Sequence, residues 1–335
     1  MATKKLEILV PQYKETDEII KPLLDSLAIQ QNIDFDDLGV IIVNDGSDVH
    51  LSDELINAYP FDIDYYLEEH RGVSGTRDSA FQHSSADYVM FCDADDMFCD
   101  VCGLYLIFNE IKNGQFDTLV SVFREESRHP ETKEIVYINR GDLQQGGIDS
   151  TFVHGKVHRR KYLIEQSIKW NPELTIHEDS YFNIMCQRLT TPNRIKYCGI
   201  PFYLWRWRDE SVCRHDPKYI LKTFNNMIES NTALVKQFMK RNRLQDAQQF
   251  VCQMIFDSYY TMNKEEWLNQ ENQEYRHNTE LRFKKYYNDF KQLYETIPEQ
   301  VKNQIIVGMK NRFFQEGMFI EKITFEDWIK HIEEM

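Results

Sequence analysis

The sequence predicts an α/β fold, with a mostly parallel sheet flanked by helices, followed by an all-helical C-terminal appendix. In the first hundred residues, short apolar runs alternate with segments whose apolar residues recur at helical spacing. Such alternation is typical of a parallel sheet with helices on both faces. From about residue 220, glycine nearly disappears, and Phe, Tyr, Met and Ile recur at helical spacing. We therefore expect two domains, residues 1–218 and 219–335.

The expected elements follow in chain order. In the first hundred residues they are strands at 6–11, 39–48, 62–69 and 87–96, with helices at 16–31 and 72–84. The pattern is more mixed up to about residue 215. There the expected elements are a helix at 103–114, a strand at 117–126, helices at 151–166 and 177–189, and a strand at 195–208.

Composition and charge limit the function classes. The chain has 335 residues, 42% of them hydrophobic, and a formal net charge of −15 from 54 acidic and 39 basic residues. This balance disfavours a nonspecific grip on nucleic acid or anionic lipid, although a local basic strip is compatible with a nucleic-acid acceptor. No stretch approaches the ~20 apolar residues of a membrane span, and the start does not resemble a signal peptide. The cysteines are scattered apart from the pair Cys99 and Cys102, so we expect a cytoplasmic protein with reduced thiols.

Two acidic clusters lie where expected strands end. Asp45 and Asp48 follow the run GVIIV, and Asp93 and Asp95 follow YVMFC. In open α/β sheets ligands bind outside the carboxyl ends of the strands, so the two clusters are expected to face one crevice. Carboxylates two residues apart in an extended chain point the same way, and they suit Mg²⁺ or Mn²⁺ bound to phosphates. Solvated turns are the alternative for both clusters.

Three further segments carry residues that suit either structure or chemistry. The turn that contains Gly72 opens a helix, where backbone amides can bind an anion, but its spacing is neither a Rossmann nor a Walker motif. Glu178 and Asp179 begin another helix, which they either cap or provide with a general base. In YLWRWRDESVCRH, the arginines and the histidine either flank a packed strand or contact phosphate or metal.

The order of these motifs resembles the inverting glycosyltransferases of family 2, which have the GT-A nucleotide-sugar-binding fold. Pro11 and Tyr13 close the first strand. Then come VIIVNDGSD, RGVSGTRDSAF, YVMFCDADD, HGKVHRRKYL, HEDSYF and an aromatic-Arg-x-Arg-x-x-Ser stretch. The resemblance covers roughly residues 4–215 and not the helical remainder. The chain departs from the usual pattern Asn-x-Gly-x-Ser-x-Ala-Arg-Asn because Thr76 and Asp78 replace Ala and Asn.

The resemblance implies roles for individual residues. The implied donor-binding residues are Pro11, Tyr13, Glu15, Asp45, Asp48, Arg71, Gly72, Arg77, Asp93, Lys156, Arg206, Arg208 and Ser211. Among them, Asp45 would contact the base, and the stretch from Arg206 to Ser211 would close over the diphosphate. The implied cofactor is a divalent cation, Mn²⁺ or Mg²⁺. Its implied ligands are Asp95, Asp93 and His215, with Asp95 as the direct one.

The resemblance also implies the reaction. Asp179, supported by Glu178, would deprotonate an acceptor hydroxyl, which attacks the anomeric carbon in a single inverting displacement. The cation and the arginines would stabilise the departing nucleoside diphosphate. We expect a UDP-sugar as donor and a cell-surface polysaccharide, teichoic acid or glycan as acceptor. The alternatives are transfer to a modified base in DNA, or nucleotide-sugar binding without catalysis.

The helical domain carries no motif of its own. We expect it to bind the acceptor, to mediate a homo-oligomer or to shield the sheet.

Overall fold

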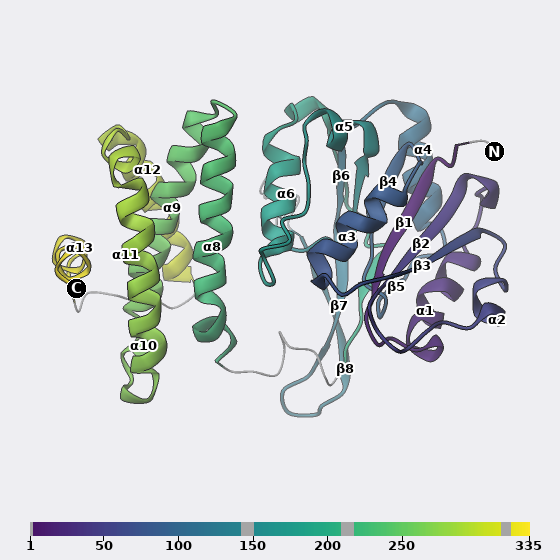
Figure 1. Cartoon of the computed structure of the whole chain (residues 1–335), viewed down its shortest axis with the longest axis horizontal. Helices are drawn as coiled ribbons and strands as arrows, with labels where there is room; N and C mark the ends of the chain where they lie inside the picture. Colours follow the sequence, from purple (N-terminus) through teal and green to yellow (C-terminus); the bar gives the residue numbers. More distant parts are fainter. Residues whose placement is uncertain (1–2, 142–150, 209–217, 316–322) are drawn as a thin grey trace. The chain divides into compact units, whose positions relative to one another are not determined.

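The computed structural model describes residues 3–141, 151–208, 218–315 and 323–335. It divides into two compact units, Met1–Ser211 and Val212–Met335 (Figure 1). Each unit has buried hydrophobic residues of its own. The domain boundary expected after residue 218 stays a prediction.

A seven-stranded sheet forms the centre of the first unit. Its strand order is β10–β6–β9–β4–β1–β2–β3, and every neighbouring pair is parallel except the two that include β9. The strands are β1 (Leu6–Gln12), β2 (Leu38–Asp45), β3 (Asp62–Glu68), β4 (Tyr88–Phe91), β6 (Thr118–Ser121), β9 (Lys156–Arg159) and β10 (Ile195–Cys198). The expected α/β fold with a mostly parallel sheet is confirmed.

Helices cover both faces of this sheet, with α3 and α6 on one side and α1 and α4 on the other (Figure 1). Ile8 of β1, Leu24 of α1 and Leu104 of α4 belong to one buried hydrophobic cluster. On the opposite face, the ring of Phe91 in β4 lies 5.4 Å from that of Phe182 in α6. Because helices cover both faces, every residue of β2 is buried, and the strand carries no polar side chain before Asn44 and Asp45 at its end. The helices are α1 (Asp17–Ala28), α2 (Asp53–Ile56), α3 (Gly72–His83), α4 (Gly103–Asn113), α5 (Arg160–Glu165) and α6 (Glu178–Arg188), with 3₁₀ turns at Phe35–Asp37 and Pro192–Arg194.

A second, four-stranded sheet brings residues near the end of this unit beside the strand that follows the D-x-D motif. Its order is β5–β11–β7–β8, with β5 (Met97–Phe98), β7 (Phe123–Arg128), β8 (Ile135–Arg140) and β11 (Tyr203–Trp205). β11 pairs antiparallel with β5, so that Tyr203 lies opposite Phe98. Because β5 directly follows the acidic turn at 93–96, this pairing brings residues 203–208 beside that turn.

Three sequence expectations about these elements were wrong. Residues 151–166 are not one helix, since 156–159 form strand β9 between β4 and β6 and only 160–165 are helical. Lys156 and His158 are polar yet buried within β9, so the strand has no apolar pattern to reveal it. The strands expected at 117–126 and 195–208 are each divided into two, and the halves belong to different sheets.

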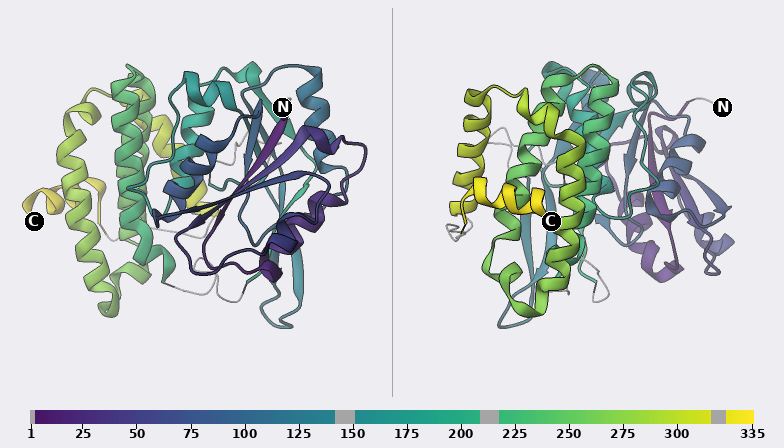
Figure 2. Two further views of the ribbon diagram at one scale, coloured as in Figure 1. Left: turned by 45° about the vertical axis from the view of Figure 1, so that its right-hand side comes forward. Right: turned by 60° about the vertical axis from the view of Figure 1, so that its left-hand side comes forward.

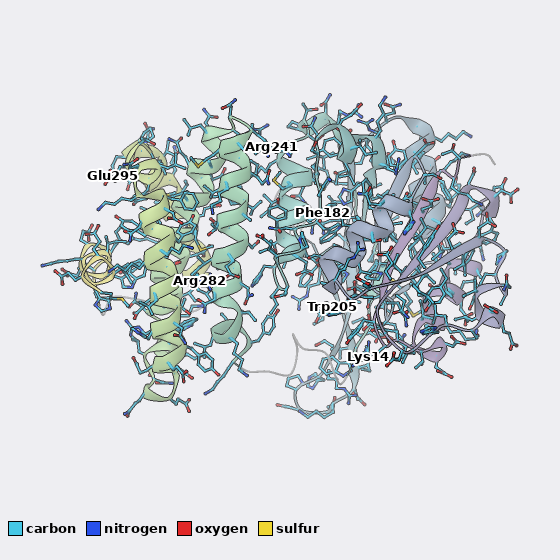
Figure 3. The ribbon with its side chains drawn as sticks, viewed as in Figure 1. Lys14, Phe182, Trp205, Arg241, Arg282 and Glu295 are labelled. Carbon is cyan, nitrogen blue, oxygen red and sulfur yellow. The ribbon has the colours of Figure 1, made fainter. Side chains whose placement is uncertain are left out.

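The described residues of the second unit contain helices and no strands, as expected. The helices are α8 (Tyr219–Lys240), α9 (Leu244–Met262), α10 (Glu265–Leu268), α11 (Gln273–Glu295), α12 (Glu299–Gln315) and α13 (Phe325–Glu334), with a 3₁₀ turn at Gln270–Asn272. The long helices α8, α9 and α11 pack alongside one another (Figure 2). Arg282 of α11, labelled in Figure 3, forms an ion pair with Glu229 of α8. In the described part of the chain, no helix combines the length and apolar character needed to cross a bilayer.

One buried carboxylate secures the inserted strand β9. Asp117, which precedes β6, accepts hydrogen bonds from Arg159 at the end of β9 (2.8 Å), from Arg194 (2.7 Å) and from the Thr190 hydroxyl (2.6 Å). These partners hold the pKa of Asp117 below its ordinary value despite the opposing effect of burial. Removing the carboxylate would leave two arginines without their shared partner.

We predict that Asp117→Ala lowers the free energy of unfolding by about 2–4 kcal/mol, measured by urea denaturation. The matched control is Asp62→Ala, which breaks an ion pair with Lys4 at a side chain that is 72% exposed. That change should stay within about 0.5 kcal/mol. Equal effects of the two substitutions would contradict a structural role for Asp117.

Candidate active site

The acidic turn after β4 lies at the carboxyl edge of the large sheet. β1 pairs in parallel with β2 on one side and with β4 on the other, so three strand ends meet at one edge. Asp45 is the last residue of β2, and Asp93 follows the end of β4 by two residues. The two acidic clusters singled out from the sequence are therefore brought to the same edge.

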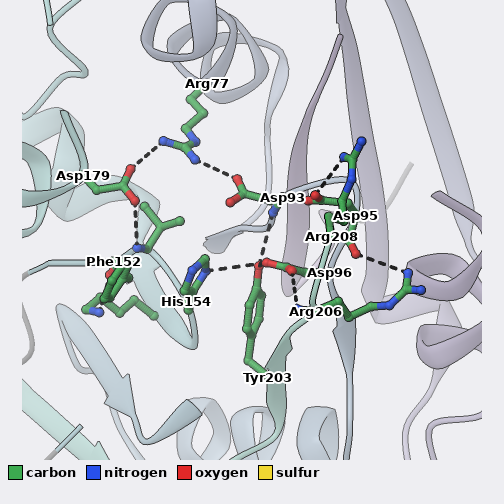
Figure 4. A network of polar contacts seen from close by, with 12 residues as sticks. Arg77, Asp93, Asp95, Asp96, Phe152, His154, Asp179, Tyr203, Arg206 and Arg208 are labelled. Carbon is green, nitrogen blue, oxygen red and sulfur yellow. Dashed lines mark hydrogen bonds and ion pairs between the residues drawn. The ribbon is translucent and has the colours of Figure 1, made fainter. Parts of the chain in front are cut away.

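Arg77 of α3 connects this edge with helix α6. Its side chain is 4% exposed, and its guanidinium carbon lies 4.8 Å from the centre of the Trp170 ring. Nη2 contacts Asp93 Oδ1 at 2.7 Å. Nη1 contacts Asp179 Oδ1 at 2.5 Å (Figure 4). The same nitrogen contacts Glu178 Oε1 at 3.1 Å. One guanidinium thus joins the D-x-D motif to the carboxylate expected to act as base.

The surroundings of Asp179 control its protonation. Its other oxygen accepts a hydrogen bond from the backbone N–H of Val153 at 3.3 Å. Burial raises the pKa of Asp179 to about 7, because the lowering effect of Arg77 is countered by the charges of Glu178 and Asp93. Burial opposes the charge on Arg77, but the surrounding carboxylates outweigh it and raise the pKa of the guanidinium. A carboxylate with such a pKa can accept a proton near neutral pH.

Asp96 is the most buried acid of the D-x-D turn, at 1% exposure. It accepts hydrogen bonds from the Tyr203 hydroxyl at 2.5 Å and from the backbone N–H of Arg206 at 2.9 Å. His154 Nδ1 lies 3.8 Å from the same carboxylate. Burial, together with the neighbouring carboxylates, raises the pKa of Asp96 well above its ordinary value. The Tyr203 hydroxyl also accepts a hydrogen bond from the backbone N–H of Asp93. Strand β11 thus contacts the turn at both Asp93 and Asp96.

Asp95 faces the segment that follows β11. Its side chain is 30% exposed, and its Oδ2 lies 2.9 Å from Arg208 Nη1. Arg206 donates a hydrogen bond to the backbone carbonyl of Asp95 at 3.3 Å. The same Arg208 nitrogen is 3.6 Å from Glu15 Oε1. Burial raises the pKa of Glu15 above its ordinary value. Two arginines and two acids singled out from the sequence are therefore close together here.

Asp45 belongs to a second group at the same edge. Its carboxylate lies 2.9 Å from His70 Nδ1 and accepts a hydrogen bond from the backbone N–H of Arg71 at 2.6 Å. The His70 ring lies 5.1 Å from that of Tyr13, which is 44% exposed. Asp48 is exposed, and among the described residues it forms no hydrogen bond or ion pair with this group. An aromatic side chain and a buried carboxylate are suitable groups for holding a planar base.

The remaining predicted residues are less closely grouped. Lys156 is 1% exposed inside β9 and donates a hydrogen bond to the Phe152 carbonyl. Pro11 lies within β1, and Gly72 begins α3 with a φ of +73° that favours glycine. Ser211 and His215 lie outside the residues that the structure describes.

Sequence reasoning missed Tyr203, His154, Trp170 and His70 as parts of the site. The first three are buried residues from segments whose strands or helices were assigned wrongly or not at all, so no local pattern revealed them. His70 stands at the start of the glycine-containing turn. It follows β3 and Tyr13 follows β1, so their proximity depends on the pairing of both strands with β2.

The D-x-D turn offers donor atoms that fit a divalent cation. Asp93, Asp96 and His154 each present one ligand atom, and these atoms lie within 4.8 Å of one another. Carboxylate oxygen and imidazole nitrogen together suit Mn²⁺, whereas Mg²⁺ favours oxygen alone. Asp95, the expected direct ligand, is on the same turn and more exposed. The described residues thus include a possible Asp/Asp/His metal-binding group.

The fold and this acidic edge define a GT-A type of protein. The family model described as Glycosyl transferase family 2 matches residues 7–166. The match lies within the first unit and does not extend into the helical unit.

Solved structures of TarS from S. aureus share the fold. Residues 1–349 of TarS match with a TM-score of 0.63 and 16% identity, over 95% of this chain and 93% of that one. The same part of TarS in complex with UDP-GlcNAc matches with a TM-score of 0.62 and 17% identity, again over 95% and 93%. At these identities the likeness concerns the fold, including that of the helical unit.

One curated relative aligns with a short part of the chain. An uncharacterized glycosyltransferase from Rickettsia bellii (strain RML369-C) is 31% identical over 96 residues. The aligned part is 28% of this chain and 13% of the relative, so the match spans a small fraction of that protein's length.

We predict that Asp179 makes protein stability fall with rising pH. Its pKa rises from 3.8 to about 7 on folding, so between these values the folded protein holds a proton that the unfolded chain has lost. This stabilisation is complete below about pH 4 and is lost as the pH rises through about 7. Across that window the free energy of unfolding should fall by about 2–4 kcal/mol more in wild type than in Asp179→Asn.

Urea denaturation between pH 4 and 8 measures this difference. Asp62→Asn, at an exposed position, should give a curve parallel to wild type. Parallel curves for wild type and Asp179→Asn would contradict the raised pKa.

Proposed function

We propose that the protein is a metal-dependent inverting glycosyltransferase. It would move a sugar from a nucleoside-diphosphate donor, a UDP-sugar, to a hydroxyl of a cell-surface polysaccharide, teichoic acid or glycan. The observation that carries this proposal is the bridge formed by Arg77, which places Asp179 and Asp93 on the two ends of one guanidinium. The match of residues 7–166 to glycosyl transferase family 2 supports the reaction class, and the complex of TarS with UDP-GlcNAc supports UDP as the nucleotide.

Asp179 is the proposed general base. Because its pKa lies near neutral pH, it can remove the proton of an acceptor hydroxyl and yet be ionised when the hydroxyl arrives. The acceptor oxygen forms a bond to the anomeric carbon as the bond from that carbon to the phosphate oxygen breaks. The bonding electrons leave with the nucleoside diphosphate. Attack from the opposite side inverts the anomeric centre in one step, with Glu178 as the supporting acid that shares Arg77 with the base.

The leaving diphosphate needs positive charge at the opposite end of the site. Arg206 and Arg208, which contact Asp95, are the proposed side chains for this task. When bound, a divalent cation would neutralise the two phosphates. Asp95 and Asp93 are its proposed ligands, with Asp96 and His154 as further donors in the same group. The role of His215 as a ligand to the cation stays a prediction.

The remaining donor contacts are proposed from the family resemblance and the geometry at the sheet edge. Tyr13 and Asp45 would hold the base, with His70 between them. The other proposed donor-binding residues are Pro11, Glu15, Asp48, Arg71, Gly72, Arg77, Lys156 and Ser211. The cytoplasmic location expected from the sequence also stays a prediction.

We predict that Asp179→Asn lowers the rate of sugar transfer by about 10²–10⁴-fold, because asparagine cannot accept the proton. The assay is release of nucleoside diphosphate from a panel of UDP-, GDP- and dTDP-sugars with Mn²⁺, with water as acceptor. Nucleotide binding, measured by calorimetry, should change less than about threefold because the substituted side chain keeps its shape.

Glu178→Gln is the matched control and should cost far less, since Glu178 supports the base without replacing it. Undiminished turnover in Asp179→Asn would remove Asp179 from the role of base. Failure of wild type to release any nucleoside diphosphate would favour a nucleotide-sugar-binding protein without catalysis. Transfer to a hydroxylated base in duplex DNA, with no transfer to glycans, would favour the DNA acceptor.

We predict that chelation with EDTA abolishes turnover and that Mn²⁺ restores it. Asp95→Ala should raise the Mn²⁺ concentration needed for half-maximal turnover by about 10- to 100-fold, because a ligand to the cation is lost. Asp62→Ala, which changes an exposed acid at the amino end of β3, should behave like wild type. Full turnover after complete chelation would contradict metal dependence and leave the arginines to stabilise the diphosphate alone.

A further inference from the structure

The helical unit contains a groove between α9 and α12, two helices that pack against each other (Figure 1). The groove has a volume of about 400 Å³. Its lining consists of two residues of α9 and four of α12: Gln249, Gln253, Gln304, Ile305, Gly308 and Met309. None of these side chains has been given a role by the reaction proposed above.

The chemistry of this lining is unusual for the chain that carries it. Half of the lining residues are glutamines, and none is ionisable, although the protein has 93 charged residues from 54 acids and 39 bases. Gln249 and Gln253 are four residues apart on α9 and so lie on the same face of the helix. Gln304 meets them from α12. Each amide offers both a carbonyl acceptor and N–H donors, which matches hydroxyl groups that are themselves donor and acceptor.

The apolar lining completes a surface suited to a sugar ring. Met309 is 7% exposed and Ile305 is half-buried beside the amides. A sugar ring presents C–H groups between its hydroxyls, and these pack on apolar side chains while the hydroxyls reach the amides. A charged ligand would find no counter-ion in this lining.

Gly308 leaves the α12 side of the groove without a side chain at one position. It lies in the middle of α12, where glycine destabilises a helix relative to alanine. Its φ is not in the left-handed region, and a Cβ at this position would meet no described atom within 4 Å. Neither the backbone nor packing against described residues requires glycine here. The absence of a side chain at this position lets a ligand approach the helix backbone closely.

We propose that this groove binds a neutral, hydroxyl-rich glycan chain, the polymer to which the enzyme adds its sugar. The inference rests on the proposed function for the identity of that chain as acceptor. The groove binds sugar units of the glycan other than the one that reacts. It therefore raises the affinity for long acceptors and does not change the rate at which the nucleotide-sugar donor is cleaved. The observations that carry it are the uncharged amide lining, the apolar residues beside it and the unfilled space over Gly308.

Binding of defined neutral oligosaccharides to the full chain tests this proposal. The probes are maltohexaose, mannohexaose, cellohexaose and chitohexaose, with hexaglycine as a peptide of similar length, titrated by ligand-observed NMR. We expect at least one hexasaccharide to bind saturably and its disaccharide to bind about tenfold more weakly. The double variant Gln253→Ala/Gln304→Ala should weaken hexasaccharide binding by about tenfold through loss of two amide contacts.

Gly308→Val provides a second variant that fills the space over the helix instead of removing amides. It should weaken glycan binding at least as strongly, while Gly308→Ala should give a smaller loss in a more stable helix. The matched control is Gln248→Ala on α9, since Gln248 donates a hydrogen bond to Thr296 and does not line the groove. Thermal unfolding verifies that each variant is folded.

Release of nucleoside diphosphate from the donor, with water as acceptor, should be unchanged in every groove variant. If wild type releases no nucleoside diphosphate, the proposed function is overturned. If it releases nucleoside diphosphate but binds no glycan, only the proposal for the groove is overturned. Absence of saturable binding by all four hexasaccharides, binding that the groove variants leave unchanged, or binding of hexaglycine alone would each overturn the inference.

Discussion

The burial of one arginine among three carboxylates is the constraint on which the site depends. Arg77 contacts Asp93, Asp179 and Glu178, so three negative charges face one positive charge and two remain when all are ionised. Buried charges without partners cost several kcal/mol each, so these acids are tolerated in one place because they share the guanidinium. The same sharing leaves Asp179 with a raised pKa and leaves the D-x-D turn attractive to a cation.

The architecture serves this arrangement by bringing distant segments to one sheet edge. Parallel pairing of β1, β2 and β4 aligns the strand ends that carry Asp45 and Asp93. The small sheet then returns residues 203–208 to the acidic turn, where Tyr203 bonds to Asp96 and the following arginines reach Asp95. The site is thus assembled from elements that are about one hundred residues apart in the sequence.

The sequence predicted the elements that local residue patterns determine, and it missed those that depend on packing between distant segments. The strands β1, β2 and β4 are apolar runs ended by turn residues, so they and the acids that follow them were found. Strand β9 was not, because Lys156 and His158 are buried by their neighbours β4 and β6 and carry no apolar pattern. The Arg77 bridge was also beyond local reasoning: the motif identified the arginine, but only the packing of α3 against α6 brings it to Asp179.

The pKa of Asp179 in wild type and in Asp93→Asn tests the central claim most directly. It is measured by pH titration of the side-chain carboxyl carbons in protein labelled with ¹³C-aspartate, with Asp179→Asn to assign the signal. Asp93 raises the pKa of Asp179 through its charge and competes for Arg77. We predict that the pKa of Asp179 is near 7 in wild type. It should fall clearly in Asp93→Asn, where Arg77 contacts two carboxylates instead of three. An unchanged pKa would contradict the coupling of the base to the D-x-D motif through Arg77.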